Sequence, residues 1–255
     1  MGNEVVFPNY DYSGVCKQYA TYGRIRGEDF SRSKKSGQVL HSIDLSGGEV
    51  FYYSGSYQAD DDPNTSDTFE LSRPLTYKGV KALHLTGRPV KRQAPTVNPK
   101  EPNPYIGGLG IGYEALPVDL TQATHVQIKV FPRTAGTLVI EIYENDGGDP
   151  KKIDKNPANY WLPEKDDDFW KTVINLKATG KWQTLTIPIA KFVDWNKKIG
   201  CSTPIKGINE DIGNGIFDPK KGEAMDFHLT FVSDGWGPEN KDIYVGKDIK
   251  FLRIK

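Results

Sequence analysis

Cysteine and methionine are scarce in this chain of 255 residues, which contains 2 of each. Cys16 and Cys201 are far apart, and neither belongs to a Cys-x-x-Cys or other zinc-binding pattern. A metal or redox centre built on cysteine is therefore not expected. The two thiols could form one disulfide bond between the N-terminal segment and the rest of the chain, or stay free, because sequence does not decide pairing.

The chain also lacks an excess of either charge. Its 33 lysine and arginine residues balance 33 aspartate and glutamate residues. Without a basic field the chain is not suited to nucleic acid or an anionic membrane surface, so neither partner is expected. No apolar run is long enough to span a membrane. Strand-like residues follow Met1-Gly2 at once, and we expect an export signal to have been removed before this point.

Apolar residues at helical spacing are absent as well, and alternation of apolar and polar residues takes their place. The clearest alternating runs are residues 124–131, 136–143, 181–192, 225–232 and 242–254. Further candidate strands are residues 39–45, 50–53, 81–87 and a run beginning at 105. Alternation puts one face of each strand into a core, so the sequence predicts an all-β fold, an antiparallel two-sheet β-sandwich of jelly-roll type. Residues 189–192, after Pro188, are expected to form a short helical turn.

The chain divides by composition into two parts. We expect residues 1–37 to form an N-terminal segment with short strands, ending in a polar, basic stretch. Residues 38–255 are expected to form the β-sandwich. The glycines of residues 105–113 are followed by neither a helix nor a Lys-Ser/Thr pair, so they predict a bulge or close backbone approach rather than a phosphate-binding loop.

Four motifs in the second part resemble a known family. They are residues 118–121 (Val-Asp-Leu-Thr), 180–188, 227–231 and 243–251. In this order they resemble the galactose-binding-like β-sandwiches, particularly carbohydrate-binding module family 11 and the complex I intermediate-associated protein 30 type domains. The resemblance implies binding of a polysaccharide or oligosaccharide, without cleavage, on a concave sheet face. The family's terminal strand usually reads Val-Asp-Asn-Ile, whereas this chain has Val-Gly-Lys-Asp-Ile at 245–249, which leaves the family's structural calcium ion open.

The N-terminal segment carries a second, fainter likeness. Residues 6–15 and 24–29 resemble the opening segments of surface glycan-binding lipoproteins in polysaccharide-utilisation loci of Bacteroides type. This likeness implies an exported bacterial protein, secreted or anchored at the cell surface. Its partners would then be a glycan and other cell-surface polysaccharide-utilisation proteins.

Sugar recognition requires flat apolar faces together with planar hydrogen-bonding groups. The chain has 5 tryptophans, most of them in expected loops, and Trp182 at a strand start is expected in the core. Trp161 and Trp170 are each expected either in the core or at the ligand. The predicted ligand-binding residues are Tyr113, Tyr160, Trp161, Trp195 and Trp236 as aromatic faces, with Asp146, Asp194 and Asp234 as hydroxyl partners.

Two other classes of function remain open. A glycoside hydrolase on this fold would need two facing carboxylates, for which Glu114 and Glu141 are candidates. Glu141 shares one face of its strand with Tyr143. A polysaccharide lyase would need a Tyr/His pair with a cation, but His84, His125 and His228 each lie in an alternating strand, where pairing within the sheet is the commoner role. No serine-nucleophile or zinc-protease signature is present, and no catalytic or metal-binding residue is assigned. The third class is a domain that binds another protein.

Overall fold

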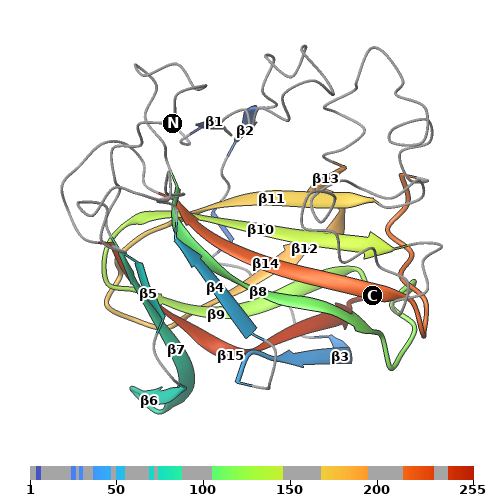
Figure 1. Cartoon of the computed structure of the whole chain (residues 1–255), viewed down its shortest axis with the longest axis horizontal. Coiled ribbons are helices and arrows are strands. Elements are labelled where there is room, and N and C mark those ends of the chain that lie inside the picture. Colours follow the sequence, from blue (N-terminus) through green and yellow to red (C-terminus); the bar gives the residue numbers. More distant parts are fainter. Residues whose placement is uncertain are drawn as a thin grey trace, which may run out of the picture.

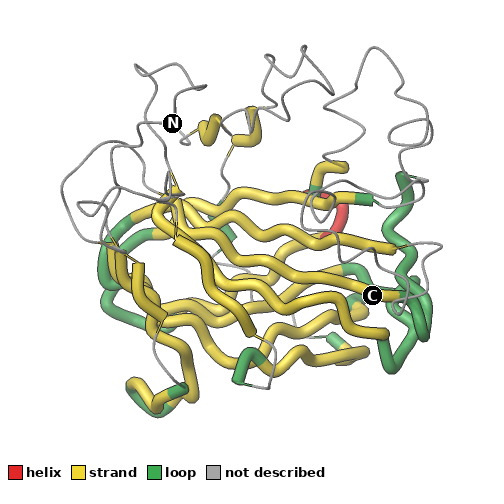
Figure 2. Tube along the Cα trace, viewed as in Figure 1, coloured by secondary structure: helices red, strands yellow, loops and turns green. Residues whose placement is uncertain are grey.

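The computed structural model describes the strands and the turns that adjoin them. The described residues are 4–6, 24–26, 29–30, 37–46, 50–54, 69–71, 74–87, 105–145, 168–194, 215–232 and 241–255. Both cysteines lie outside this part. Within it, nearly every residue is in a strand or a short turn, and the single helical element is a 3-10 turn (Figure 2).

The strands follow one another along the whole chain. Those of the first half are β1 (Glu4–Val6), β2 (Arg24–Arg26), β3 (Gln38–Asp44), β4 (Val50–Ser54), β5 (Phe69–Leu71), β6 (Leu75–Tyr77), β7 (Val80–Gly87) and β8 (Tyr105–Ala115). Those of the second half are β9 (His125–Pro132), β10 (Gly136–Asn145), β11 (Phe169–Leu176), β12 (Gln183–Pro188), β13 (Val193–Asp194), β14 (Ala224–Val232) and β15 (Lys241–Arg253). The 3-10 turn η1 (Ile189–Lys191) follows β12, as the sequence predicted.

Two antiparallel sheets form the sandwich (Figure 1). The six-stranded sheet has the order β13-β11-β10-β14-β8-β4. The seven-stranded sheet has the path β12-β9-β15-β7-β5, with β3 paired to β15 and β6 paired to β7. The fold class predicted from alternation is therefore confirmed. β1 and β2 pair with each other within the predicted N-terminal segment, and the domain boundary at residue 37 stays a prediction.

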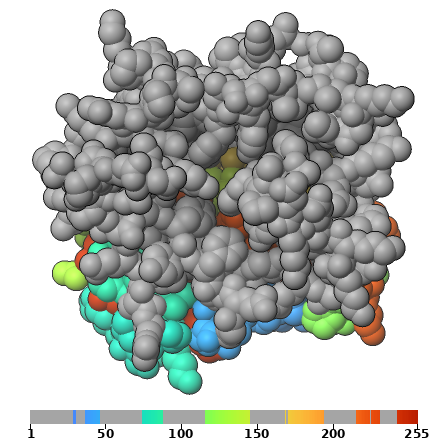
Figure 3. All heavy atoms as spheres, in the orientation of Figure 1, coloured from blue at the N-terminus to red at the C-terminus, as the bar shows by residue number. Residues whose placement is uncertain are grey.

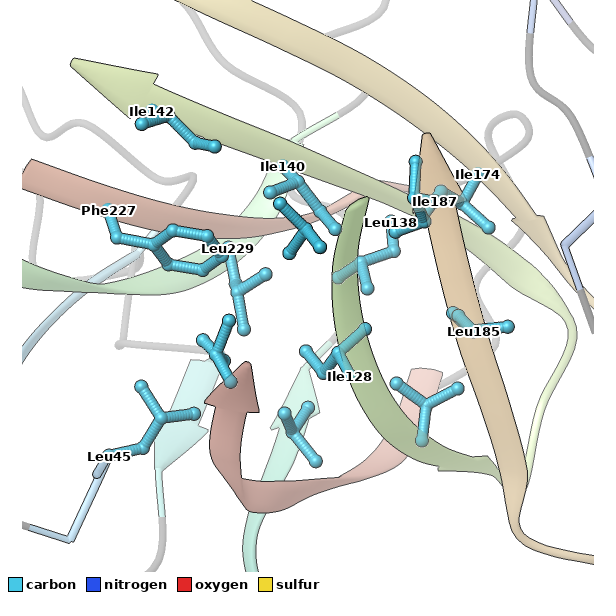
Figure 4. Packing of buried hydrophobic residues seen from close by; sticks show 14 of the residues in the cluster. Leu45, Ile128, Leu138, Ile140, Ile142, Ile174, Leu185, Ile187, Phe227 and Leu229 are labelled. Carbon is cyan, nitrogen blue, oxygen red and sulfur yellow. The ribbon is translucent and has the colours of Figure 1, made fainter. Parts of the chain in front are cut away.

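The core lies between the two sheets and is built by alternate residues of each strand. On β10, Leu138, Ile140 and Ile142 are fully buried and turn toward the seven-stranded sheet (Figure 4). Ile128 of β9 and Leu185 of β12 meet them from the other side. Each fully buried aliphatic side chain contributes about 1.5–3 kcal/mol to folding, so this layer holds the sheets together.

Strand β11 was not predicted from the sequence. Its residue Trp170 is 8% exposed and belongs to the main core, together with Ile174 and Leu176. Of the two alternatives for Trp170, the structure therefore selects the core. Phe30, from the predicted N-terminal segment, packs in the same core.

Trp182 was expected in the core, but it lies outside the main core between the two sheets. It is partly exposed and packs on the opposite, outer side of the seven-stranded sheet, against Phe131 and Tyr244. Its indole Nε1 donates a hydrogen bond to the Tyr77 carbonyl at 3.2 Å. The position of Trp182 explains this contact: Trp182 precedes β12, and the β6–β7 hairpin brings Tyr77 over this face of the sheet.

No helix in the described part of the chain is long and apolar enough to cross a membrane.

Candidate binding site

Charged residues stand in a row on the outer face of the six-stranded sheet. Glu141 of β10 lies directly between Lys171 of β11 and His228 of β14 in the strand register. Because Ile140 and Ile142 point into the core, the alternation of a strand turns Glu141 the other way. The row therefore crosses three adjacent strands on the side opposite the core. Figure 3 views the molecule from this side, and atoms of β10, β11 and β14 are visible at its centre.

Glu141 and Lys171 form a buried ion pair in this row. The ammonium Nζ of Lys171 contacts Oε1 of Glu141, and the two side chains are only 10% and 14% exposed. Burial raises the pKa of Glu141, but the charges of Lys171 and His228, with hydrogen bonds from Lys171 and Tyr143, outweigh it. The pKa of Glu141 is lowered below its ordinary value, so the carboxylate stays ionised.

His228 forms a second buried pair with Asp226, two residues earlier on the same face of β14. His228 Nε2 lies 2.8 Å from Asp226 Oδ2, and both side chains are 5% exposed. Burial lowers the pKa of His228, whereas the hydrogen bond and charge of Asp226, and the charge of Glu141, raise it above its ordinary value overall. The imidazole is therefore protonated over a wider pH range and donates to Asp226. The other carboxylate oxygen, Oδ1 of Asp226, is buried and accepts no hydrogen bond.

Tyr143 extends the site by one aromatic ring. It stands opposite Asp226 in the register, one row beyond Glu141. Its ring centroid is 4.9 Å from that of His228, with the two rings tilted by 54°. We define the outer-face cluster as Glu141, Tyr143, Lys171, Asp226 and His228.

Next to the outer-face cluster, β8 contributes glycines. Gly110 stands opposite His228, and Gly108 stands opposite Thr230. The register shifts between Met225 and Phe227, so Gly112 and Tyr113 share the place opposite Asp226. The predicted bulge in this glycine-rich run is confirmed. Because glycine has no side chain, β8 leaves this face low beside the cluster.

Strand β4 follows on the far side of β8. Phe51 pairs with Gly110 and Tyr53 pairs with Gly108. These two aromatic positions belong to the same rows as His228 and Thr230. Neighbouring strands lie about 4.8 Å apart, so a strip roughly 10 Å wide separates β14 from β4, with glycine positions between them.

One of the predicted ligand-binding residues lies next to the outer-face cluster. Tyr113 lies on β8 beside Asp226, in the same row as Tyr143. Asp194 lies on the edge strand β13, opposite the core residue Trp170. The other predicted residues, Tyr160, Trp161, Trp195, Trp236, Asp146 and Asp234, lie outside the described part of the chain. All eight stay predictions.

Sequence reasoning placed Glu141 and Tyr143 on one face but did not find Lys171, Asp226 or their mutual arrangement. The local signal was present in β14, where Asp226 and His228 alternate with Phe227 and Leu229. Polar residues at alternate positions of an apolar strand indicate one face. Which neighbours that face would meet depends on strand pairing over 30 residues or more, which the alternation does not encode.

The candidate hydrolase pair, Glu114 and Glu141, stays a prediction. Glu114 stands opposite Met225 in the strand register, and Glu141 stands opposite His228, so β14 lies between the two strands that carry them.

The residues at 245–249 do not fit the calcium ion that the family resemblance left open. Lys247 Nζ lies 2.7 Å from Asp44 Oδ2 and 2.8 Å from Asp248 Oδ1, so an ammonium group already lies between both carboxylates. Within the described ranges, no group of three or more His, Cys, Asp or Glu could hold a metal ion. Hydrogen bonds from Lys247 and Ser46 lower the pKa of Asp44 to about 2.

The seven-stranded sheet has an Asp–His pair of its own on its outer face. His84 Nε2 lies 2.8 Å from Asp242 Oδ1, and Arg133 Nη1 lies 3.0 Å from Asp242 Oδ2. The Tyr244 ring stacks between those of His84 and Tyr77, at centroid distances of 4.2 Å and 3.7 Å. Both carboxylate oxygens of Asp242 therefore have a partner, whereas Asp226 has one only at Oδ2.

Comparison with known proteins returns solved structures only, since no family model and no curated protein matches the chain. One similar structure is a family 11 carbohydrate-binding module from Clostridium thermocellum in complex with a β-1,3-1,4-mixed-linked tetrasaccharide. It is 13% identical, with 87% of this chain and 99% of that chain covered and a TM-score of 0.47. A mannan-recognising carbohydrate-binding module is 10% identical, with 87% and 100% covered and a TM-score of 0.37. An agarase is 9% identical, with 84% of this chain but 26% of that chain covered and a TM-score of 0.41.

The chain is thus similar in fold to solved β-sandwiches, several of which are carbohydrate-binding modules, including those of family 11. At this identity and these TM-scores the likeness does not extend to a ligand or to individual residues. The ligand therefore has to be argued from the outer-face cluster itself.

Proposed function

We propose that this chain binds carbohydrate on the outer face of its six-stranded sheet and does not cleave it. The observation that carries the proposal is the outer-face cluster, in which charged, planar hydrogen-bonding groups stand beside an aromatic ring on adjacent strands. Sugar hydroxyls pair with carboxylate and imidazole groups, and the C–H face of a sugar ring packs on aromatic rings. Both kinds of group occur here, away from the core.

The cluster is also held in place before any ligand arrives. Lys171 and Glu141 fix each other, and Asp226 fixes His228 at 2.8 Å. Groups that are already ordered lose little conformational entropy on binding, which favours affinity. Two cations and two anions cancel, so the cluster as a whole offers no net attraction to a charged polymer.

A second candidate function is polysaccharide lyase activity, favoured by the proximity of Tyr143, His228 and Lys171. A lyase removes a proton from the carbon beside a uronate group, and a base must accept it. His228 is a poor base here, because its Nε2 is already hydrogen-bonded to Asp226 and its raised pKa widens the pH range over which the imidazole is protonated. Non-catalytic binding is the better account of the same residues.

The wider setting is proposed from the sequence. The likeness of residues 6–15 and 24–29 to surface glycan-binding lipoproteins supports an exported bacterial protein, secreted or held at the cell surface. In that setting its partners would be a polysaccharide and other surface proteins of polysaccharide utilisation. Detection of the protein in intact-cell surface labelling, against a cytoplasmic marker, tests this proposal.

Affinity electrophoresis through gels containing plant, algal and host polysaccharides tests the binding function, with product analysis of each lane. Retardation without new reducing ends or unsaturated products is the expected result. Unsaturated uronate products, seen as new ultraviolet absorbance, would establish the lyase instead. An absence of both retardation and cleavage across the panel would favour a domain that binds another protein.

A further inference from the structure

Asp226 has one carboxylate oxygen in use and one without a donor. Oδ2 lies 2.8 Å from His228 Nε2, whereas Oδ1 is buried and has no hydrogen-bond partner. A buried carboxylate oxygen without a donor is unfavourable, and such atoms in native proteins call for a specific explanation. The matched residue on the opposite sheet, Asp242, has both oxygens engaged, by His84 and Arg133.

Glycines stand beside Asp226 and His228 on the neighbouring strand. Gly110 pairs with His228, and Gly112 shares with Tyr113 the place opposite Asp226. Glycine permits close approach of another group to the backbone, and an aromatic position such as Tyr113 suits the C–H face of a sugar ring. A ligand hydroxyl that reaches Asp226 here would meet an acceptor oxygen that has no donor.

The charge of the site limits what that ring can carry. Asp226 and Glu141 are both carboxylates on this face, and Lys171 and His228 are already paired with them. A ligand carboxylate placed at Oδ1 of Asp226 would meet a like charge at low exposure, which is strongly unfavourable. A ligand hydroxyl at the same place would donate the missing hydrogen bond.

We propose that Oδ1 of Asp226 accepts a hydrogen bond from a hydroxyl of an uncharged sugar ring, which makes Asp226 the residue that selects neutral glycans over polyuronates. This inference rests on the proposed carbohydrate-binding function. It adds a substrate class and a residue that determines specificity.

The test is affinity electrophoresis of the full chain and two variants, Asp226→Asn and Asp242→Asn. The gels contain neutral mixed-linkage β-glucan, galactomannan or agarose, or the polyuronates alginate or polygalacturonate. We expect at least one neutral polymer and neither polyuronate to retard the wild-type chain. Asp226→Asn should weaken binding to that neutral polymer about ten- to a hundred-fold, the effect of losing a hydrogen bond to a charged acceptor.

Asp242→Asn is the matched control, because it removes the same charge from an Asp–His pair of equal length on the other sheet. It should bind like the wild type. Retardation of Asp226→Asn equal to that of the control would overturn this inference and leave carbohydrate binding intact. Failure of every polymer to retard the wild type would remove both.

A folding defect in Asp226→Asn, seen as a lower melting temperature, would not end the test. The wild-type chain alone then decides, because the inference requires neutral polymers to retard it and polyuronates not to do so. Stronger retardation by alginate or polygalacturonate would contradict the role of Asp226.

Discussion

Lys171 and Glu141 show how a buried charge pair acts on stability. A pair desolvated to this degree gains little net free energy over an apolar pair, but loss of one partner leaves an uncompensated charge. Lys171→Met should therefore lower the free energy of unfolding by about 3–5 kcal/mol, because Glu141 would remain ionised or take up a proton in a buried position. Urea unfolding at pH 7, followed by tryptophan fluorescence, measures this change.

The control for this prediction removes both charges. Lys171→Met combined with Glu141→Gln should recover a large part of the loss, because neither buried position then carries an unpaired charge. A single Lys171→Met variant as stable as the wild type would show that water reaches Glu141 in solution.

His228 should give the protein a specific pH dependence. Its pKa is raised in the folded state relative to its ordinary value near 6.5, so protonation favours folding. The stabilisation is complete below the unfolded-state pKa and is lost as the pH rises through the higher folded-state pKa. His228→Gln should remove this loss, which urea midpoints measured from pH 5 to 9 will show.

His84→Gln provides the comparison for His228, since His84 also pairs with an aspartate, on the opposite sheet. The loss of stability above neutral pH should persist in His84→Gln, because that variant retains His228, and it should vanish in His228→Gln. The same pH profile in both variants and the wild type would mean that Asp226 and Glu141 do not hold the proton on His228.

At the scale of elements, an ion pair between Lys247 and Asp44 links strand β15 to strand β3. The ammonium of Lys247 lies 2.7 Å from Asp44 at the end of β3, and the pKa of Asp44 falls from 3.8 to about 2. A lowered carboxylate pKa adds stability above the ordinary value, and that stability is lost as the pH falls from about 4 to about 2. Asp44 is about half exposed, so solvent screening limits the effect to below about 1 kcal/mol.

Asp44→Asn measures this contribution. Urea midpoints of the variant and the wild type should differ slightly at pH 5 and converge as the pH falls to about 2 and below, where Asp44 becomes protonated in the folded state as well. A difference that stays constant across this range would indicate packing rather than charge, and 1 M salt should reduce a difference that is electrostatic.

The turn of the β6–β7 hairpin combines an unfavourable backbone conformation at Lys78 with a favourable contact of its side chain. Lys78 and Gly79 both have positive φ, 45° and 80°, in the two-residue turn where Tyr77 pairs with Val80. This turn favours Asn-Gly, and lysine costs about 1 kcal/mol there. The Lys78 ammonium, however, lies 4.4 Å from the Phe131 ring centroid, which returns about 0.5–1 kcal/mol.

The two effects at Lys78 should nearly cancel. Lys78→Asn should change the free energy of unfolding by less than about 0.5 kcal/mol, because it relieves the backbone and loses the cation–ring contact. Lys78→Val loses the contact and worsens the backbone strain, so it should cost about 1–2 kcal/mol. Thermal unfolding of both variants checks the order, and a strongly stabilised Lys78→Asn would mean that the ring contact contributes nothing.

At the scale of the whole molecule, the sequence predicted the sandwich better than its site. Alternation is a local signal, and it located β10 and β14 to within two residues. Strand β11 was not predicted from the sequence because both of its faces are buried. Lys171 and Val173 lie on the face opposite the core, yet their side chains are nearly inaccessible to solvent. A strand buried on both sides does not alternate clearly. The cluster required the register of β11, β10 and β14, which no local pattern contains.

The predicted ligand-binding residue Trp195 directly follows the edge strand β13. Val193 of β13 pairs with Lys171 of the outer-face cluster, and the strand ends at Asp194. If Trp195 supplies an aromatic face there, Trp195→Ala should weaken glycan binding about ten-fold or more, as loss of a central aromatic contact does. The melting temperature should stay near that of the wild type. Affinity electrophoresis and thermal unfolding of the same sample separate the two effects.

Trp182→Phe is the control for Trp195→Ala, because Trp182 packs on the outer face of the other sheet. It should leave glycan binding unchanged while costing some stability through loss of the hydrogen bond to Tyr77. Unfolding of Trp195→Ala would instead identify Trp195 as a core residue. The aromatic faces for the sugar would then have to come from Tyr143 and from the β4 positions Phe51 and Tyr53, across the glycines of β8.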